Sequence, residues 1–361
     1  MDRKIWRNFD FVLLAATVFL VVFGVAMIYS ATPDTPDLRD LPRRQAIWAL
    51  VGLALMPLVA AIDYRFLGNL QKPLYALIIA SLLLVLLVGQ ATYGAQRWIS
   101  GSSFQPSELA KVLIIVTLAQ FLARREKEIG RFHYVLLSII LVAVPMVLIY
   151  LQPHLGTVIV LAVVWLIMVL MAGMHPLHLG VFGLIGLLAT PLIWVSLKGY
   201  MQERLLLFVN PARDPAARYN IDQALISIGS GGWLGKGYAS GSQSQLHFLR
   251  VRHTDFIFSV IGEEMGFVGA LVLFALIGIV LWRILRAASL ARDSFGRLIA
   301  CGVAALIFFQ SLVNIGMNLG LLPVIGIPLP FISSGGSSLI TLLVAEGLVQ
   351  SVVMRHKKIE F

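Results

Sequence analysis

The feature that most constrains this chain is a series of about ten apolar runs, each long enough to cross a lipid bilayer as a helix. A membrane-spanning helix needs about 20 predominantly apolar residues. The runs cover approximately residues 11–28, 45–62, 73–89, 106–123, 134–151, 156–173, 179–197, 256–281, 298–319 and 335–354. This pattern predicts an all-α integral membrane protein with about ten transmembrane helices.

Composition supports a membrane protein and argues against a soluble one. The chain has 361 residues, of which 59% are hydrophobic and 13% are charged, whereas soluble chains carry roughly 25% charged residues. So few polar side chains cannot cover a water-facing surface of this size. The net charge of +10 falls in short segments between the apolar runs, which indicates membrane topology and no nucleic-acid partner.

The distribution of Lys and Arg predicts which helix ends face the cytoplasm, because the basic residues of short loops concentrate on that side. With the N-terminus inside, the inner segments carry the basic clusters within residues 3–7, 65–72, 124–127, 283–297 and 355–358. The short outer loops then hold only Arg39, Arg43, Arg44 and Arg97. We therefore predict that both termini are cytoplasmic.

One connection is much longer than the others. Residues 198–254 lie between the predicted seventh and eighth helices, on the extracytoplasmic side. Loops of this length are usually functional or disordered, and this one contains Trp233, Phe208 and other large apolar residues that disordered segments lack. We expect it to fold back over the bundle, partly as short helices, within a single polytopic domain that covers residues 1–361.

Two ionisable residues fall at the outer end of the predicted fourth helix, and such residues inside membrane spans are costly enough to suggest a function. Glu108 and Lys111 are three positions apart, so their side chains can pair on one helical face. A structural ion pair that locks this helix to its neighbours and a direct role in substrate binding both remain open.

Asp255 lies where the long loop enters the eighth helix, near the positive end of the helix dipole. Arg250, Arg252 and His253 directly precede it, and we expect such a carboxylate to be ionised at neutral pH, as a proton acceptor or a cation ligand. The alternative is an ordinary acidic residue in a first helical turn. Glu263 and Glu264 follow about two turns deeper. Adjacent helical residues point about 100° apart, so the two cannot both lie on the face of Asp255, and at least one is expected to serve a structural partner.

Two further stretches are rich in glycine or proline. Residues 228–237 superficially resemble a phosphate loop, but the spacing differs from Gly-x4-Gly-Lys-Ser/Thr, so we expect a tight outer loop that admits a bulky lipid-linked substrate. Residues 326–338 contain two prolines followed by small residues, which predicts tightly packed non-helical backbone before the last helix. Simple close packing is the alternative explanation for the second stretch.

These segments together resemble the SEDS family (shape, elongation, division and sporulation). The matching stretches are residues 94–99, 104–111, 152–157, 228–237, 253–264 and 326–338. The chain departs from the family in three places. His154 stands where Asp is usual, Arg250-Val251 stand where Pro-Glu is common, and Ser334 stands where Tyr is frequent. Because of His154, this loop lacks the carboxylate that the family usually has there.

The resemblance implies a bacterial peptidoglycan glycosyltransferase of the plasma (inner) membrane that polymerises lipid II at the outer face, with a class B penicillin-binding transpeptidase as partner. Asp255 matches the essential aspartate of the family. The chain lacks long cytoplasmic extensions, which favours a role in cell elongation and shape control over one in division.

In this chemistry a sugar hydroxyl loses a proton as it attacks an anomeric carbon, and a diphosphate departs. Asp255 is the candidate general base. Positive charge must stabilise the leaving diphosphate, and the candidates are Lys111, Arg97, Arg204, Arg213, Arg218 and Lys236. We expect Glu108, Arg252, His253 and Glu263 to support the site. A divalent cation would assist, but no cluster of ligands indicates one, and the sequence identifies no other cofactor.

Two other classes of protein fit part of the pattern. A flippase for lipid-linked precursors would also use intramembrane charges and proline-broken helices, whereas a pure scaffold for a transpeptidase would not need Asp255. The suggestive residues cluster at the outer face and in the long loop instead of the bilayer midplane. This location favours the glycosyltransferase.

Overall fold

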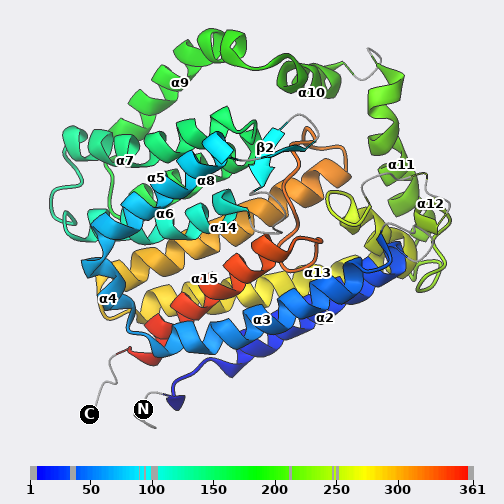
Figure 1. The fold of residues 1–361 in the computed structure, drawn as a ribbon, viewed down its shortest axis with the longest axis horizontal. Coiled ribbons are helices and arrows are strands. Elements are labelled where there is room, and N and C mark those ends of the chain that lie inside the picture. Colours follow the sequence, from blue (N-terminus) through cyan, green and yellow to red (C-terminus); the bar gives the residue numbers. More distant parts are fainter. Residues whose placement is uncertain are drawn as a thin grey trace.

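The helices of this computed structural model form an elongated bundle, with α9 (Pro176–Ser196), α10 (Gly199–Val209) and α11 (Pro215–Gly231) along its upper edge and right-hand end in Figure 1. The structure describes residues 6–32, 38–88, 90–92, 95–98, 105–210, 214–245, 248 and 252–356. Within these residues, eight helices are long and apolar enough to cross a membrane. They are α2 (Phe11–Ala31), α3 (Leu41–Ala61), α5 (Gln71–Val88), α6 (Pro106–Ala123), α7 (Phe132–Leu151), α13 (Ile257–Leu290), α14 (Ser294–Asn318) and α15 (Gly336–Met354).

Two further apolar helices, α8 (Leu155–Met171) and α9, bring the described bundle to the ten predicted spans. In α8 and in the apolar part of α9, Pro176–Leu192, the hydrophobic stretch is shorter than in the other eight. The predicted all-α membrane fold is therefore confirmed.

Three helices form the centre of the bundle. Within their spanning segments, 78% of the residues of α6 and α14 and 83% of those of α15 are buried, against 28% or less in α3, α5, α7 and α13. The outer helices instead present large apolar side chains such as Leu50, Leu87 and Val147 at the surface. Apolar surface on this scale is expected where lipid surrounds a protein.

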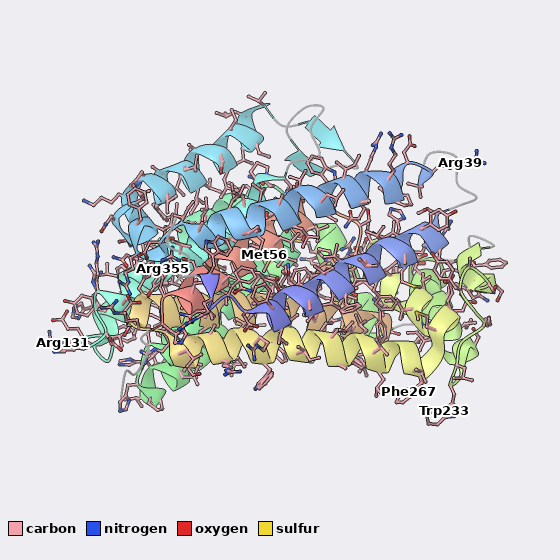
Figure 2. The ribbon with its side chains drawn as sticks, turned by 90° about the horizontal axis from the view of Figure 1, so that it is seen from below. Arg39, Met56, Arg131, Trp233, Phe267 and Arg355 are labelled. Carbon is pink, nitrogen blue, oxygen red and sulfur yellow. The ribbon has the colours of Figure 1, made fainter. Side chains whose placement is uncertain are left out.

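The first and last described residues lie at one end of the bundle, and the long segment between α9 and α13 lies at the other. The start of α2 lies beside the end of α15, because the main-chain N–H of Asp10 donates to Gln350 Oε1 (2.9 Å) and Gln350 Nε2 donates to the carbonyl of Asp10 (2.8 Å). Figure 2 shows Arg131 and Arg355 toward this end, and Arg39, Trp233 and Phe267 at the other. Both described termini thus share the end that the basic residues assign to the cytoplasm.

The long outer segment contains short helices, as expected. Between α9 and α13 the described chain forms α10, α11 and α12 (Ser242–Gln245), and α11 packs chiefly against α13. Two elements were not predicted. A short antiparallel hairpin pairs β1 (Gln90–Thr92) with β2 (Ala95–Trp98), and a six-residue helix, α4 (Tyr64–Asn69), follows α3.

The predicted limits of the eighth span, 256–281, were wrong at the inner end. Helix α13 continues to Leu290, so the segment from Arg283 onward is largely helical instead of an inner loop. Ile284 and Ala287 are buried while Arg286 is exposed. The extension is therefore amphipathic. The span was predicted too short because a search for continuous apolar residues does not detect amphipathic turns.

Candidate functional site

Asp255 lies immediately before α13, at the end of the bundle opposite the termini. It borders a cavity of about 400 Å³. Most of the lining is apolar, with a few polar groups, which is typical of ligand sites. The lining residues are Pro153, His154, Leu155, Ile159, Leu197, Met201, Arg204, Leu205, Asp255, Pro323, Val324, Ile325 and Gly326.

Two buried amides of α14 hold the main chain of Asp255. Asn318 Nδ2 donates to the Asp255 carbonyl oxygen at 2.8 Å, and Asn314 Nδ2 lies 3.2 Å from the same oxygen. Asn318 Oδ1 also accepts hydrogen bonds from the main-chain N–H (3.2 Å) and the hydroxyl (2.6 Å) of Ser259. Sequence reasoning missed this pair, although two amides four residues apart in an apolar helix lie on one face.

The proline-rich and serine-rich segment fixes the two residues before Asp255. Residues 319–335 contain no helix or strand, so the predicted non-helical backbone is confirmed. Ser333 Oγ donates to the carbonyl of Thr254 (2.6 Å), and the main-chain N–H of Ser334 donates to the carbonyl of His253 (3.0 Å). Loop carbonyls near a membrane need such partners, because an unpaired buried carbonyl is costly.

Gly326 brings this segment close to the Asp255 side chain. Its φ is +75°, a conformation that favours glycine. A Cβ atom built on Gly326 would lie 3.6 Å from Asp255 Oδ2 and 3.9 Å from Arg204 Nη1. Asp255 and Arg204 therefore face the same small region of the cavity wall.

Arg204 comes from α10 and lines two cavities at once. Its Nη1 donates to the carbonyl of Val324 (3.3 Å). The second cavity, of about 500 Å³, shares Arg204, Pro323 and Val324 with the first. Its further polar lining residues, which the sequence did not single out, are Glu203, Asp214 and Asn220. Among the candidate cations with described side chains, only Arg204 lines these cavities.

Three other basic residues of the outer segment with described side chains have carboxylate or carbonyl partners of their own. Lys236 Nζ lies 2.9 Å from Glu263 Oε1, and Arg218 Nε lies 2.8 Å from Asp222 Oδ1 on α11. Arg252 Nε donates to the carbonyl of Ala31, the last residue of α2. Arg213 and Arg250, together with the side chain of Arg97 on β2, lie outside the described residues.

Glu108 and Lys111 form the predicted ion pair on α6. Lys111 Nζ lies 2.8 Å from Glu108 Oε2, and the two side chains are only 3% and 5% exposed. The start of α6 is joined to α15, because the main-chain N–H of Gln105 donates to Ser337 Oγ at 2.8 Å. The pair therefore lies at the outer end of the central helices, as the sequence predicts.

The glycine-rich stretch packs backbone against backbone on a break in α13. Gly266 interrupts that helix with φ 62° and ψ −157°, and a Cβ atom on Gly235 would lie 2.1 Å from the Glu264 carbonyl oxygen. The main-chain N–H groups of Lys236 and Gly237 donate to the carbonyls of Glu263 and Glu264. Close packing explains these glycines more directly than access for a bulky substrate.

Both adjacent glutamates of α13 have structural partners. Glu263 Oε1 accepts from Lys236 Nζ and from the main-chain N–H of Gln243, each at 2.9 Å. Glu264 accepts from Ser30 Oγ and from the main-chain N–H of Ala239. Glu263 and Glu264 are 0% and 1% exposed. Together they attach the outer loop to α13 and to α2.

His253 differs from the expected cationic neighbour of Asp255. Burial lowers its pKa, and the positive charge of Arg252 lowers it further. Since an ordinary histidine has a pKa of about 6.5, His253 is neutral at pH 7. Positive charge near Asp255 must therefore come from arginines, of which Arg204 lines the same cavity as Asp255.

The described part of the chain shows no cluster of metal-binding side chains. Within it, no three His, Cys, Asp or Glu side chains gather where they could hold an ion. His154 Nδ1 instead lies 2.7 Å from Thr157 Oγ1 at the start of α8.

The fold and the site define a class: a multi-pass helical membrane protein with two adjoining cavities at one end of the bundle, bordered by a carboxylate and a guanidinium. A family model described as cell cycle protein FtsW/RodA/SpoVE matches residues 11–358. The chain therefore belongs to this family, which is the SEDS family.

Similar proteins agree on this assignment. The chain is 37% identical over 359 residues to the peptidoglycan glycosyltransferase MrdB of Escherichia coli K12, covering 97% of this chain and 95% of that protein. It is 36% identical over 376 residues to the probable peptidoglycan glycosyltransferase FtsW of Geobacter sulfurreducens (strain DL-1 / KN400), covering 99% and 98%. A solved chain from "Structural coordination of polymerization and crosslinking by a peptidoglycan synthase complex" matches with a TM-score of 0.82 at 35% identity, covering 96% and 97%.

Proposed function

We propose that this chain, a SEDS peptidoglycan glycosyltransferase, polymerises lipid II into glycan strands at the outer face of the bacterial plasma membrane. The observation that carries the proposal is the placement of Asp255 and Arg204 on one cavity wall. A base and a cation side by side are what glycosyl transfer with a diphosphate leaving group requires. The relatives MrdB and FtsW, named as peptidoglycan glycosyltransferases, support the same reaction.

In this proposal the Asp255 carboxylate accepts the proton of the acceptor hydroxyl as that oxygen attacks the anomeric carbon of the donor sugar. The bond from the anomeric carbon to the diphosphate breaks, and the diphosphate leaves with its lipid. Arg204 offers a guanidinium, which matches phosphate geometry with two parallel hydrogen bonds. The hydrogen bonds from Asn314 and Asn318 to the Asp255 carbonyl keep its main chain in place.

The two adjoining cavities suit a reaction between two lipid-linked saccharides. They meet at Arg204, Pro323 and Val324. One cavity contains Asp255 and the other contains Glu203, Asp214 and Asn220. We infer that one holds the donor and the other the acceptor, with the reacting atoms at the shared wall.

The remaining predicted residues support this site in the proposal. The Glu108–Lys111 pair and the Lys236–Glu263 pair fix the outer ends of α6 and α13. Arg252 and His253 shape the approach to Asp255. Arg97, Arg213 and Arg218 remain candidates for contacts with the diphosphate or with outer saccharide units.

We propose further that the chain acts as one polytopic domain, with residues 198–254 as its outer loop, in cell elongation and shape control. A class B penicillin-binding transpeptidase is the proposed partner. The similar solved chain from a study of polymerization and crosslinking by a peptidoglycan synthase complex supports this partnership. Depletion in a rod-shaped host should give rounded cells, whereas filaments would assign the chain to division.

The purified chain should make glycan from lipid II in liposomes without any other polymerase. The readout is the length distribution of glycan products on a gel, with movement of labelled lipid II between leaflets measured in parallel. Absence of glycan together with transport of lipid II would replace the glycosyltransferase by a flippase.

A further inference from the structure

A third cavity, lined largely by polar residues, lies at the end of the bundle that carries the termini. Its volume is about 180 Å³, and it is bordered by the start of α2, the end of α13 and the end of α15. Four of its residues carry basic groups: Arg7, Arg283, Arg286 and His356. The cavity is far along α13 from Asp255, and the proposed reaction does not use it.

Among the described residues that line this cavity, the one acidic side chain, Asp10, is already neutralised. Asp10 Oδ1 accepts from the main-chain N–H groups of Val12 and Leu13, which caps α2. Asp10 Oδ2 lies 2.7 Å from Arg283 Nε and 2.6 Å from Arg283 Nη2. Asp10 and Arg283 therefore cancel each other's charge.

Two arginines that line the cavity have no carboxylate to balance their charge among the described residues. Arg7 and Arg286 are exposed, and within the described chain neither has a carboxylate at ion-pair distance. Like charges held together around a cavity, without acidic partners, favour binding of an anion.

The surroundings of the cavity indicate that the anion belongs to a lipid. Large apolar side chains lie at the surface of two of the three helices that border it: Phe11 of α2 is 66% exposed, and Trp282 and Leu285 of α13 are 59% and 52% exposed. Tryptophan is enriched at the membrane–water interface. A phosphate in the cavity would thus have apolar surface beside it for acyl chains.

We propose that this cavity binds the phosphate group of an anionic phospholipid of the inner leaflet. Basic pockets between membrane helices on the cytoplasmic side are suited to such headgroups. Arg286 of α13 and Arg7 before α2 would contact the same phosphate, with Arg283 held in place by Asp10. The lipid would thereby join the start of α2, the end of α13 and His356 after α15.

The test compares lipid retention by the purified full chain. Native mass spectrometry after exchange into phosphatidylglycerol or phosphatidylcholine should show retained phosphatidylglycerol only. The double variant Arg7→Gln/Arg286→Gln should retain at least about fivefold less phosphatidylglycerol, since two guanidinium–phosphate contacts disappear. Arg292→Gln is the matched control, because Arg292 is an exposed arginine of the same end and lies outside the cavity.

Three results would overturn the proposal. In the first, the double variant and the control retain equal amounts of phosphatidylglycerol. In the second, the wild-type chain retains as much phosphatidylcholine as phosphatidylglycerol. In the third, millimolar inorganic phosphate displaces the lipid. The last would assign the cavity to a free anion. The single variant Arg286→Gln, with an expected smaller loss, keeps the test valid if the double variant fails to fold. None of these measurements depends on glycan synthesis.

Discussion

Glu108 and Lys111 are charges buried together near the outer end of α6. Glu108→Gln or Lys111→Met alone should destabilise the protein by about 3–5 kcal/mol, because each leaves one buried charge without its partner. The double variant should lose less than the sum of the two. Thermal unfolding of the purified variants measures the loss of stability in the two single variants and in the double variant. Strictly additive losses would show that the two residues act independently.

His253 should make stability depend on pH near neutrality. Its pKa is lowered in the folded protein by burial and by Arg252, while in the unfolded chain it is about 6.5. Between the two values the unfolded chain binds a proton that the folded chain does not, so stability should fall as pH drops below about 6.5.

The measurement is the difference in melting temperature between pH 7.5 and pH 5.5. His253→Gln should reduce this difference, because the buried imidazole is then absent. An unchanged difference in His253→Gln would show that His253 does not cause the dependence.

Single residues of the site were predictable to different degrees. The Glu108–Lys111 pair stands out in the sequence because charges inside membrane-spanning runs are rare, and Asp255 stands out because it matches the essential aspartate of the family. Arg204 could not be ranked above the other cations, since its place depends on how α10 folds back toward residues 323–326. Asn314 and Asn318 were missed because an amide in an apolar run has no distinctive spacing to a distant loop carbonyl.

At the scale of elements, α11 offers a matched test of the close packing against α13. A Cβ atom on Gly231 would lie 1.9 Å from the Gly262 carbonyl oxygen, whereas one on Gly229 meets nothing within 4 Å. Gly231→Ala should therefore destabilise by about 1–3 kcal/mol through overpacking. Gly229→Ala should be neutral or stabilising by up to about 1 kcal/mol, because alanine favours a helix.

Thermal unfolding of the two variants checks this pair directly. Equal melting temperatures would contradict the backbone contact between α11 and α13.

The apolar elements followed from the sequence because each span needs about 20 apolar residues. The sequence did not predict three elements: the inner end of α13, the helix α4 and the β1–β2 hairpin. The end of α13 is amphipathic, and α4 and the two strands are too short for their periodicity to be distinguished from that of a loop. The break at Gly266 depends on tertiary contact with the glycine-rich stretch.

At the scale of the whole molecule, the sidedness of the bundle can be tested by chemical labelling. Ser240→Cys and Lys127→Cys, in a Cys301→Ala background, place one thiol at an exposed position near each end. An impermeant thiol reagent added to intact cells should label position 240 only. Labelling at position 127 would reverse the orientation derived from the basic residues.

The overall architecture was predictable because lipid restricts a spanning chain to few solutions, namely helices and closed barrels. What the sequence left open is how residues 198–254 sit over the bundle, since that segment has no uniform hydrophobic period. The path of α10 and α11 decides which cations reach Asp255, so the site was less predictable than the fold.

Asp255 is proposed as the base of glycan polymerisation. Asp255→Asn keeps the size of the side chain and removes the proton acceptor, so polymerisation of lipid II by the purified protein should fall by at least about two orders of magnitude. Asp40→Asn, at an exposed outer aspartate without a capping hydrogen bond, should leave the rate unchanged. Polymerisation at the wild-type rate by a folded Asp255→Asn protein would exclude Asp255 as the base.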